Sequence, residues 1–141
     1  METTAIGDEL LAIRSAFLSR LVHQTFNGYV MSQFKKLERD VRNGSAPKWK
    51  HAMHLIRLLI SGITLLSTGA MEVRVTTHRD KLLTIRSGSM PWEQVENWRL
   101  SLHREFDASL TSSPLPEMPD TERINRFLIE SRRVVALGGQ P

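Results

Sequence analysis

Lys50, His54 and Arg57 are spaced along an apolar stretch of the chain, residues 47–69. On an α-helix, which turns by about 100° per residue, these three side chains fall within an arc of roughly 80°. The same arc also holds three hydroxyl side chains, those of Ser61, Thr64 and Thr68. Ammonium, guanidinium and imidazole groups on one helix face are suited to binding phosphate or carboxylate oxygens. We call Lys50, His54 and Arg57 the cationic seam.

Two interpretations of the cationic seam follow from the sequence. The seam could bind an anionic ligand, or it could pair with acidic side chains inside the fold. The candidate partners within the chain are Glu38, Glu93 and Glu96. In the second case, loss of one partner would leave a buried charge uncompensated.

Two further arrangements of side chains could do chemistry. His51 and His54 are three residues apart and share a helix face, but no Asp or Glu lies in the next turn, so a metal site is not predicted. Arg99 and His103 are four residues apart on one predicted helix. This arrangement is similar to the arginine–histidine pair of some helical-bundle ribonucleases, in which the spacing is one residue longer. The alternative is an ordinary pair of solvated side chains.

Carboxylates for a catalytic metal site are not grouped in this sequence. The five aspartates occupy positions 8, 40, 80, 107 and 120, and none forms an Asp-x-Asp pair. Asp120 and Glu122 have that spacing but open a predicted helix, where acidic residues serve as cap and dipole partner. No serine stands in a GxSxG turn. The sequence therefore predicts no self-contained active site.

The composition is that of a basic protein with enough apolar residues for a core. The chain has 141 residues, 40% of them hydrophobic, and a net charge of +4 with 19 basic residues, mostly arginine. We predict a single domain over residues 1–141. The absence of cysteine excludes disulfides and thiolate catalysis and is typical of a reducing compartment. Because no signal-peptide pattern is present, and His54 and Arg57 interrupt the longest apolar run, we expect a cytoplasmic protein without a membrane span.

Helical periodicity dominates the chain. The five main predicted helices cover residues 8–21, 23–42, 47–68, 91–110 and 120–135. A brief helix is expected between Asp80 and Gly88, and Val73 and Val75 alternate with polar residues, which predicts a short extended piece. Residues 111–119 form a proline-rich connector. The predicted fold class is mainly α, a single bundle-like domain of five or six helices with a short β ornament.

Local signals predict how these helices begin, end and meet. Asp8 and Asp120 are expected to cap the first and last helices. Gly44 is expected to end the second helix, because glycine favours the left-handed conformation that follows many helices. Gly28 is expected to let a neighbouring helix approach closely.

Four segments carry a resemblance to a known family: FNGYVMSQFKKLERD, KWKHAMHLIRLLISG, LLTIRSGSMPWEQVENW and SSPLPEMPD. In this order they resemble the C-terminal helical half of predicted nucleotidyltransferases of the DNA polymerase β superfamily, the type associated with RNA repair. The resemblance covers residues 19–133. Its most specific parts are Lys50-x3-His54-x2-Arg57-Leu58 and Leu83-x-Ile85-Arg86-x-Gly88.

The resemblance implies that Lys50, His54, Arg57 and Arg86 bind nucleotide phosphates beside a catalytic cleft. It implies magnesium and a nucleoside triphosphate for the parent enzyme, and no cofactor for this chain alone. The catalytic half of such enzymes carries a Gly-Ser motif followed by an Asp-x-Asp metal site, which this sequence lacks. The chain therefore resembles the helical half alone, as an excised piece, a split gene product or a degenerate relative. It is not expected to transfer nucleotides unaided.

Three functions are compatible with the sequence. The first is a nucleotide- or RNA-binding accessory half of a nucleotidyltransferase, whose partner would be the missing catalytic half. The second is a stand-alone interaction or inhibitor module, and self-association through Leu10, Ile13 and Phe17 of the first helix is expected of an isolated half. The third is a helical ribonuclease that uses Arg99 and His103.

Overall fold

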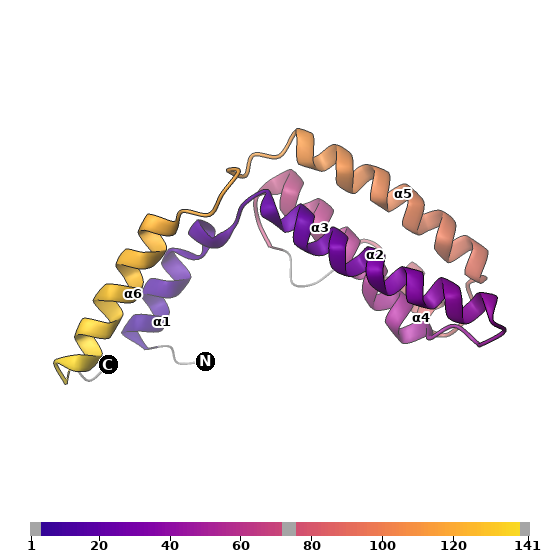
Figure 1. The fold of residues 1–141 in the computed structure, drawn as a ribbon, viewed down its shortest axis with the longest axis horizontal. Coiled ribbons are helices and arrows are strands. Elements are labelled where there is room, and N and C mark those ends of the chain that lie inside the picture. The colour runs from indigo at the N-terminus through magenta and orange to yellow at the C-terminus, as the bar shows by residue number, and fades with distance from the viewer. Residues whose placement is uncertain (1–3, 72–75, 139–141) are drawn as a thin grey trace. The chain divides into compact units, whose positions relative to one another are not determined.

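The computed structural model describes residues 4–71 and 76–138 (Figure 1). Throughout these residues the regular structure is helical, with six α-helices and one 3₁₀ helix. The predicted fold class, mainly α with five or six helices, is confirmed. The extended piece predicted at Val73 and Val75 lies outside the described residues. The chain divides into two compact units, residues 20–114 and the segments on either side of them. The single domain expected over residues 1–141 stays a prediction.

Residues 20–114 form a four-helix unit around α3. The helices are α2 (Leu21–Arg42), α3 (Trp49–Thr68), α4 (Arg79–Arg86) and α5 (Trp92–Thr111). α3 packs against each of the other three. The large apolar side chains that are fully buried here are Val30, Phe34, Leu55, Ile56, Leu59, Leu65, Leu66, Ile85, Val95 and Phe106. Half of them belong to α3, so burial of this helix is the main source of the unit's stability.

The end of α2 follows its sequence signal. Gly44 has a φ of 87°, in the left-handed region. Its N–H donates to the carbonyl of Val41 at 3.0 Å, and the N–H of Ser45 donates to the carbonyl of Asp40 at 2.9 Å. These two bonds satisfy carbonyls that the helix end leaves without partners, as in a Schellman motif. The prediction that Gly44 ends this helix is confirmed.

The close helix approach occurs at Gly62 of α3, where α2 and α5 both contribute an aromatic ring. A Cβ atom at this position would lie 2.7 Å from Cε2 of Phe106 and 3.0 Å from Cδ2 of Phe26. At Gly28, by contrast, no neighbouring atom lies within 4 Å of the equivalent position. The prediction of a close approach at Gly28 is therefore wrong, because that residue lies on the exposed side of α2.

The other unit contains α1 (Ala5–Ala12), a 3₁₀ helix (Arg14–Phe17) and α6 (Thr121–Ala136). α1 packs against α6, and the two run antiparallel (Figure 1). Asp120 caps α6 as predicted, since its side chain accepts a hydrogen bond from the N–H of Arg123 at 3.1 Å. α1 is capped by Thr4 instead of Asp8, because the N–H of Gly7 donates to the Thr4 hydroxyl at 3.0 Å.

The continuous helix predicted over residues 8–21 is wrong. α1 ends at Ala12, and Leu18 after the 3₁₀ helix is extended, with φ −87° and ψ 134°. The carbonyl of Ala16 accepts a hydrogen bond from the N–H of Asp120 at 2.9 Å. In a continuous helix this carbonyl would bond within the helix. A contact with the start of α6 thus replaces the local hydrogen bond. The other four main helices, α2, α3, α5 and α6, end within two residues of the expected bounds.

We predict opposite effects of alanine at the two helical glycines. Gly62→Ala should destabilise the fold by about 1–3 kcal/mol, because the new methyl group overlaps the rings of Phe106 and Phe26. Gly28→Ala should stabilise it by about 0.5–1 kcal/mol, because alanine loses less backbone entropy in a helix. Urea unfolding of both variants tests this. Equal stability of the two variants would contradict the close approach at Gly62.

Candidate phosphate-binding face

The cationic seam lies on the solvent-facing side of α3. Lys50 and Arg57 are exposed and His54 is half-buried. Among the residues that the structure describes, no carboxylate forms an ion pair or a hydrogen bond with these three side chains. Glu38, one of the candidate partners, instead binds Arg99 of α5, with 3.1 Å between Oε1 and Nη2. The seam is thus not an internal ion-pair network within residues 4–71 and 76–138.

His54 is the titrating member of the seam. Partial burial, then the positive charge of Arg57, then His51, lower the pKa of His54 below its ordinary value. At neutral pH the ring is therefore mostly uncharged, so one ring nitrogen donates and the other accepts. A bound phosphate would favour the protonated ring and would raise this pKa again.

A surface depression of about 450 Å³ lies at the start of α3 beside the seam. It is lined by Lys48, Trp49, Lys50, His51 and His54, with no acidic residue. His51 is oriented by a 3.2 Å hydrogen bond between Nε2 and Oε1 of Gln33 on α2. Sequence reasoning missed Lys48 and His51 as parts of this face. The position of Lys48 just before the helix was the available signal, because cations beside free helical N–H groups favour an anion.

Arg86, the fourth predicted site residue, lies in the exposed last turn of α4. Gly88, two residues later, meets the indole of Trp49, so this end of α4 adjoins the start of α3. Leu82 and Ile85 are buried, and Nζ of Lys81 lies 3.9 Å above the ring of Trp98 on α5.

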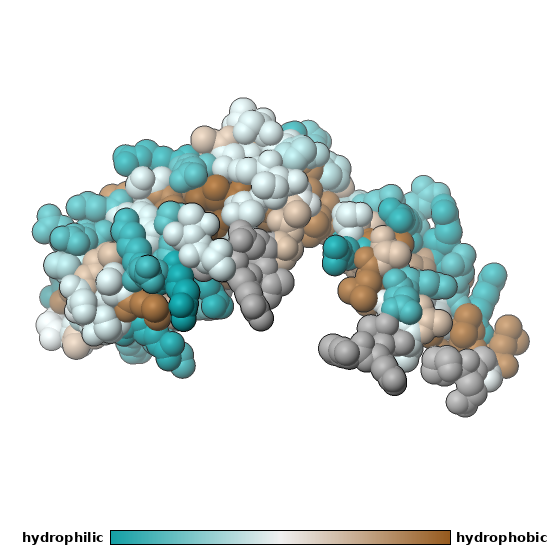
Figure 2. Space-filling model, turned by 180° about the vertical axis from the view of Figure 1, so that it is seen from behind, coloured by the Kyte–Doolittle hydropathy of each residue, from teal (hydrophilic) through white to brown (hydrophobic). Residues whose placement is uncertain are grey.

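By helical spacing, Arg79 and Arg86 then lie on the flank of α4 opposite Lys81. This flank is turned away from the contact that Lys81 makes with Trp98 of α5. Figure 2 views the bundle from behind α2, and hydrophilic side chains gather at the end where α4 lies. Arg86 thus adds an exposed cation at the end of α4 that adjoins the start of α3.

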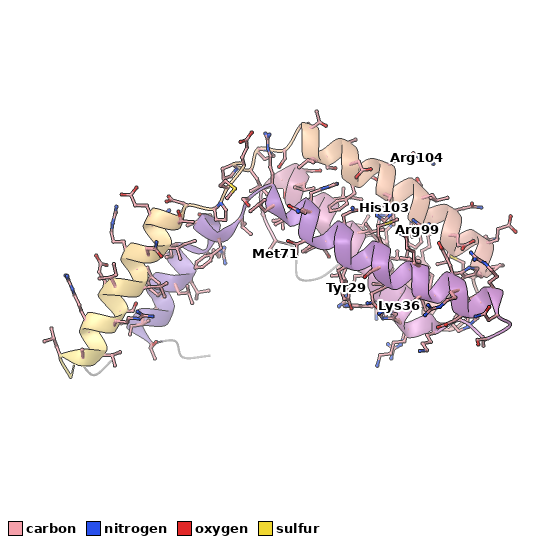
Figure 3. All side chains as sticks on the ribbon, viewed as in Figure 1. Tyr29, Lys36, Met71, Arg99, His103 and Arg104 are labelled. Carbon is pink, nitrogen blue, oxygen red and sulfur yellow. The ribbon has the colours of Figure 1, made fainter. Side chains whose placement is uncertain are left out.

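Arg99 and His103 are buried in the contact between α5 and α2, each only 9% exposed. Figure 3 shows both side chains projecting from α5 toward α2. Beyond its ion pair with Glu38, the guanidinium of Arg99 lies 5.1 Å from the ring centre of Phe34. Nε2 of His103 lies 3.0 Å from Oδ1 of Asn27. The two side chains join α5 to α2. Arg99 also lines a surface depression beside Glu38 and Glu96, but His103 does not, so the ribonuclease interpretation receives no support from their geometry.

Metal ligands are not grouped in the part of the chain that the structure describes, where no set of three or more His, Asp or Glu side chains converges. The described residues therefore do not fit the two-metal site that nucleotidyl transfer requires. On the candidate phosphate-binding face, the described residues provide cations.

The comparison with protein families decides the relationship. The model of the RNA repair pathway DNA polymerase beta family, RlaP, matches residues 1–130. The chain belongs to the RlaP family. No curated protein and no solved structure shows significant similarity to the chain. Membership in the RlaP family associates the chain with nucleotidyltransferases and with RNA repair, as the sequence resemblance predicted.

The apolar composition of α3 bears on one further property of this RlaP-family chain, a possible membrane span. By length and composition alone, α3 is long and apolar enough to cross a membrane. Core helices of soluble proteins pass the same test, and the apolar side of α3 is covered by α2, α4 and α5. The finding is therefore weak support for a membrane span.

We predict that Arg99 and Arg57 differ sharply in their effect on stability. Arg99→Met should destabilise the fold by about 2–4 kcal/mol, because Glu38, whose side chain is only 26% exposed, loses its partner. Arg57→Met on the exposed seam should change stability by no more than about 0.5 kcal/mol. Urea unfolding at neutral pH measures both. Similar losses from the two variants would show that the seam is also structural.

His103 should make the fold less stable in acid. Burial and the charge of Arg99 lower the pKa of His103, although Asp107 opposes this shift. The unfolded chain therefore takes up a proton near the ordinary pKa of 6.5 before the folded chain does. Stability should be complete above this pH and fall as the pH drops through it. His103→Gln should reduce the fall, as measured by urea unfolding across the range. An unchanged pH profile would contradict the assignment.

Proposed function

We propose that this chain supplies the phosphate-binding helical part of an RNA-repair nucleotidyltransferase and acts beside a catalytic part that carries the metal-binding carboxylates. The observation that supports this most is the exposed cationic seam without carboxylate partners among the described residues. Membership in the RlaP family supplies the reaction class.

The seam has the donors that a phosphate chain needs. Lys50 and Arg57 hold non-bridging oxygens through charge-assisted hydrogen bonds, and Arg57 offers a planar fork for two oxygens at once. His54, one helical turn before Arg57, donates a further hydrogen bond from its ring. Arg86 approaches from α4. The phosphates belong to a nucleoside triphosphate or to the RNA end on which the enzyme acts.

The unpaired state of the seam gives the proposal its energetic basis. Cations that are already paired must break those contacts before they bind a ligand, whereas Lys50 and Arg57 have no ion pair to break among the described residues. Because His54 is mostly neutral before binding, the ring adds a donor to the face without adding repulsion between neighbouring cations. Binding an anion to this face therefore breaks no ion pair among the described residues, and its cost is the ordering of the side chains, about 0.5–1.5 kcal/mol each.

Neutralising the seam should weaken phosphate binding and leave the fold intact. In the variant Lys50→Gln/Arg57→Gln, each lost charge-assisted hydrogen bond should cost about 1.5–3 kcal/mol of binding free energy. Fluorescence titration with a labelled nucleoside triphosphate and with a short 5′-phosphorylated RNA measures the loss, and a thermal melt measures stability.

The matched control compares Arg57→Gln with Arg104→Gln. Arg104 is equally an exposed arginine of the four-helix unit, but it projects from α5, which packs on the buried side of α3 (Figure 3). Arg104→Gln should leave affinity almost unchanged. Equal losses of affinity in both variants would mean that binding depends only on the net charge of the chain. A large fall in Tm with unchanged affinity in the double variant would sink the proposal.

A further inference from the structure

The unit built from α1 and α6 exposes an unusual amount of apolar surface. Neither helix contains a buried residue. In α6, Leu128 is 44% exposed and Val135 is 67% exposed. These two positions are seven residues apart and therefore lie on one side of the helix. In α1 and the 3₁₀ helix, the large apolar side chains of Leu10, Leu11 and Phe17 are exposed as well.

We propose that this apolar surface joins two copies of the chain, so that the antiparallel α1–α6 pairs of both copies form a four-helix interface. Two antiparallel helices that touch along one line cover only part of each apolar stripe. A second identical pair covers the remaining part, and a two-fold axis places α1 of each copy on α6 of the other.

The charges of the two helices favour a second copy as the occupant. α1 contains Asp8 and Glu9 and no basic residue, whereas α6 contains four arginines against two glutamates. A two-fold interface therefore brings an acidic helix against a basic one at both of its ends. An anionic lipid surface would attract α6 but would meet the acidic side chains of α1 beside it.

The small size of the α1–α6 unit also favours dimerisation. The α1–α6 unit has few buried side chains, of which Ala16 and Leu115 are the apolar ones among the described residues. Units this small usually need oligomerisation or another added constraint to be stable. Dimerisation provides the missing core without adding any new element to the chain.

The first test measures the mass of the whole chain by sedimentation over a wide concentration range. Twice the chain mass of 16.1 kDa is expected at high concentration, falling to one chain mass on dilution. Leu128→Glu/Val135→Glu should raise the dissociation constant at least about a hundredfold, because each change removes one buried aliphatic side chain. The matched control is Leu83→Glu/Leu100→Glu, at similarly exposed leucines of α4 and α5, which should leave the mass unchanged.

A charge exchange keeps the test decisive even if the acidic pair unfolds α6. Glu9 lies beside the apolar stripe of α1, and Arg132 lies between Leu128 and Val135 on α6. Glu9→Arg alone and Arg132→Glu alone should each dimerise at least tenfold more weakly, and a mixture of the two should recover dimers. A chain that stays monomeric at the highest concentration would overturn the proposal. So would equal effects of the control variant, or a mixture that recovers nothing.

Discussion

The contact at Gly62 constrains three of the four helices in the unit formed by residues 20–114. Rings from α2 and α5, those of Phe26 and Phe106, both approach the backbone of α3 at this one position. A helix held at such close range has little freedom to rotate about its axis, because rotation would drive a side chain of α3 into a ring. The rotation that this contact selects buries Leu55, Leu59 and Leu66, and it leaves the cationic seam facing water. Packing inside the bundle thus sets the orientation of the candidate site.

The polar side chains of the bundle fall into two groups. One group is paired between α2 and α5, and the other, on α3, faces water. Between α2 and α5, His23 pairs with Asp107, Asn27 with His103 and Glu38 with Arg99, so each of these side chains has a partner on the facing helix, whereas Nε of Arg99 and Nδ1 of His103 are buried without one. Burial makes such pairing necessary, since an unpaired charge there would be costly. On α3 the cations face water and need no protein partner. Glu38, which the sequence offered as a candidate partner of the cationic seam, belongs to the first of these groups.

Periodicity along the chain was sufficient to predict the long helices, because each carries one continuous apolar stripe that must be buried. It could not identify which glycine lies at a helix contact, since Gly28 and Gly62 both interrupt helical patterns and only the partner rings distinguish them. It also could not predict that the chain leaves helical geometry at Leu18, where the carbonyl of Ala16 bonds instead to the N–H of Asp120, far apart in sequence. The spacing of the cationic seam could be predicted from the sequence. The burial of Arg99 and His103 was not, because charged residues at helical spacing usually face solvent.

Charge balance explains why an exposed cationic face suits a member of this family. In phosphoryl and nucleotidyl transfer, metal ions offset part of the charge of the triphosphate, and protein cations must offset the charge that spreads over its oxygens as the bond breaks. Carboxylates bind the metals, so they must be held apart from the cations that serve the phosphates, or the two groups would neutralise each other. Among the described residues, Lys50, Arg57 and Arg86 are exposed, and Glu38 is held by Arg99 in the contact between α2 and α5. Under the proposed function, a helical part that contributes cations and a separate part that contributes carboxylates keep the two kinds of charge distinct until a substrate lies between them.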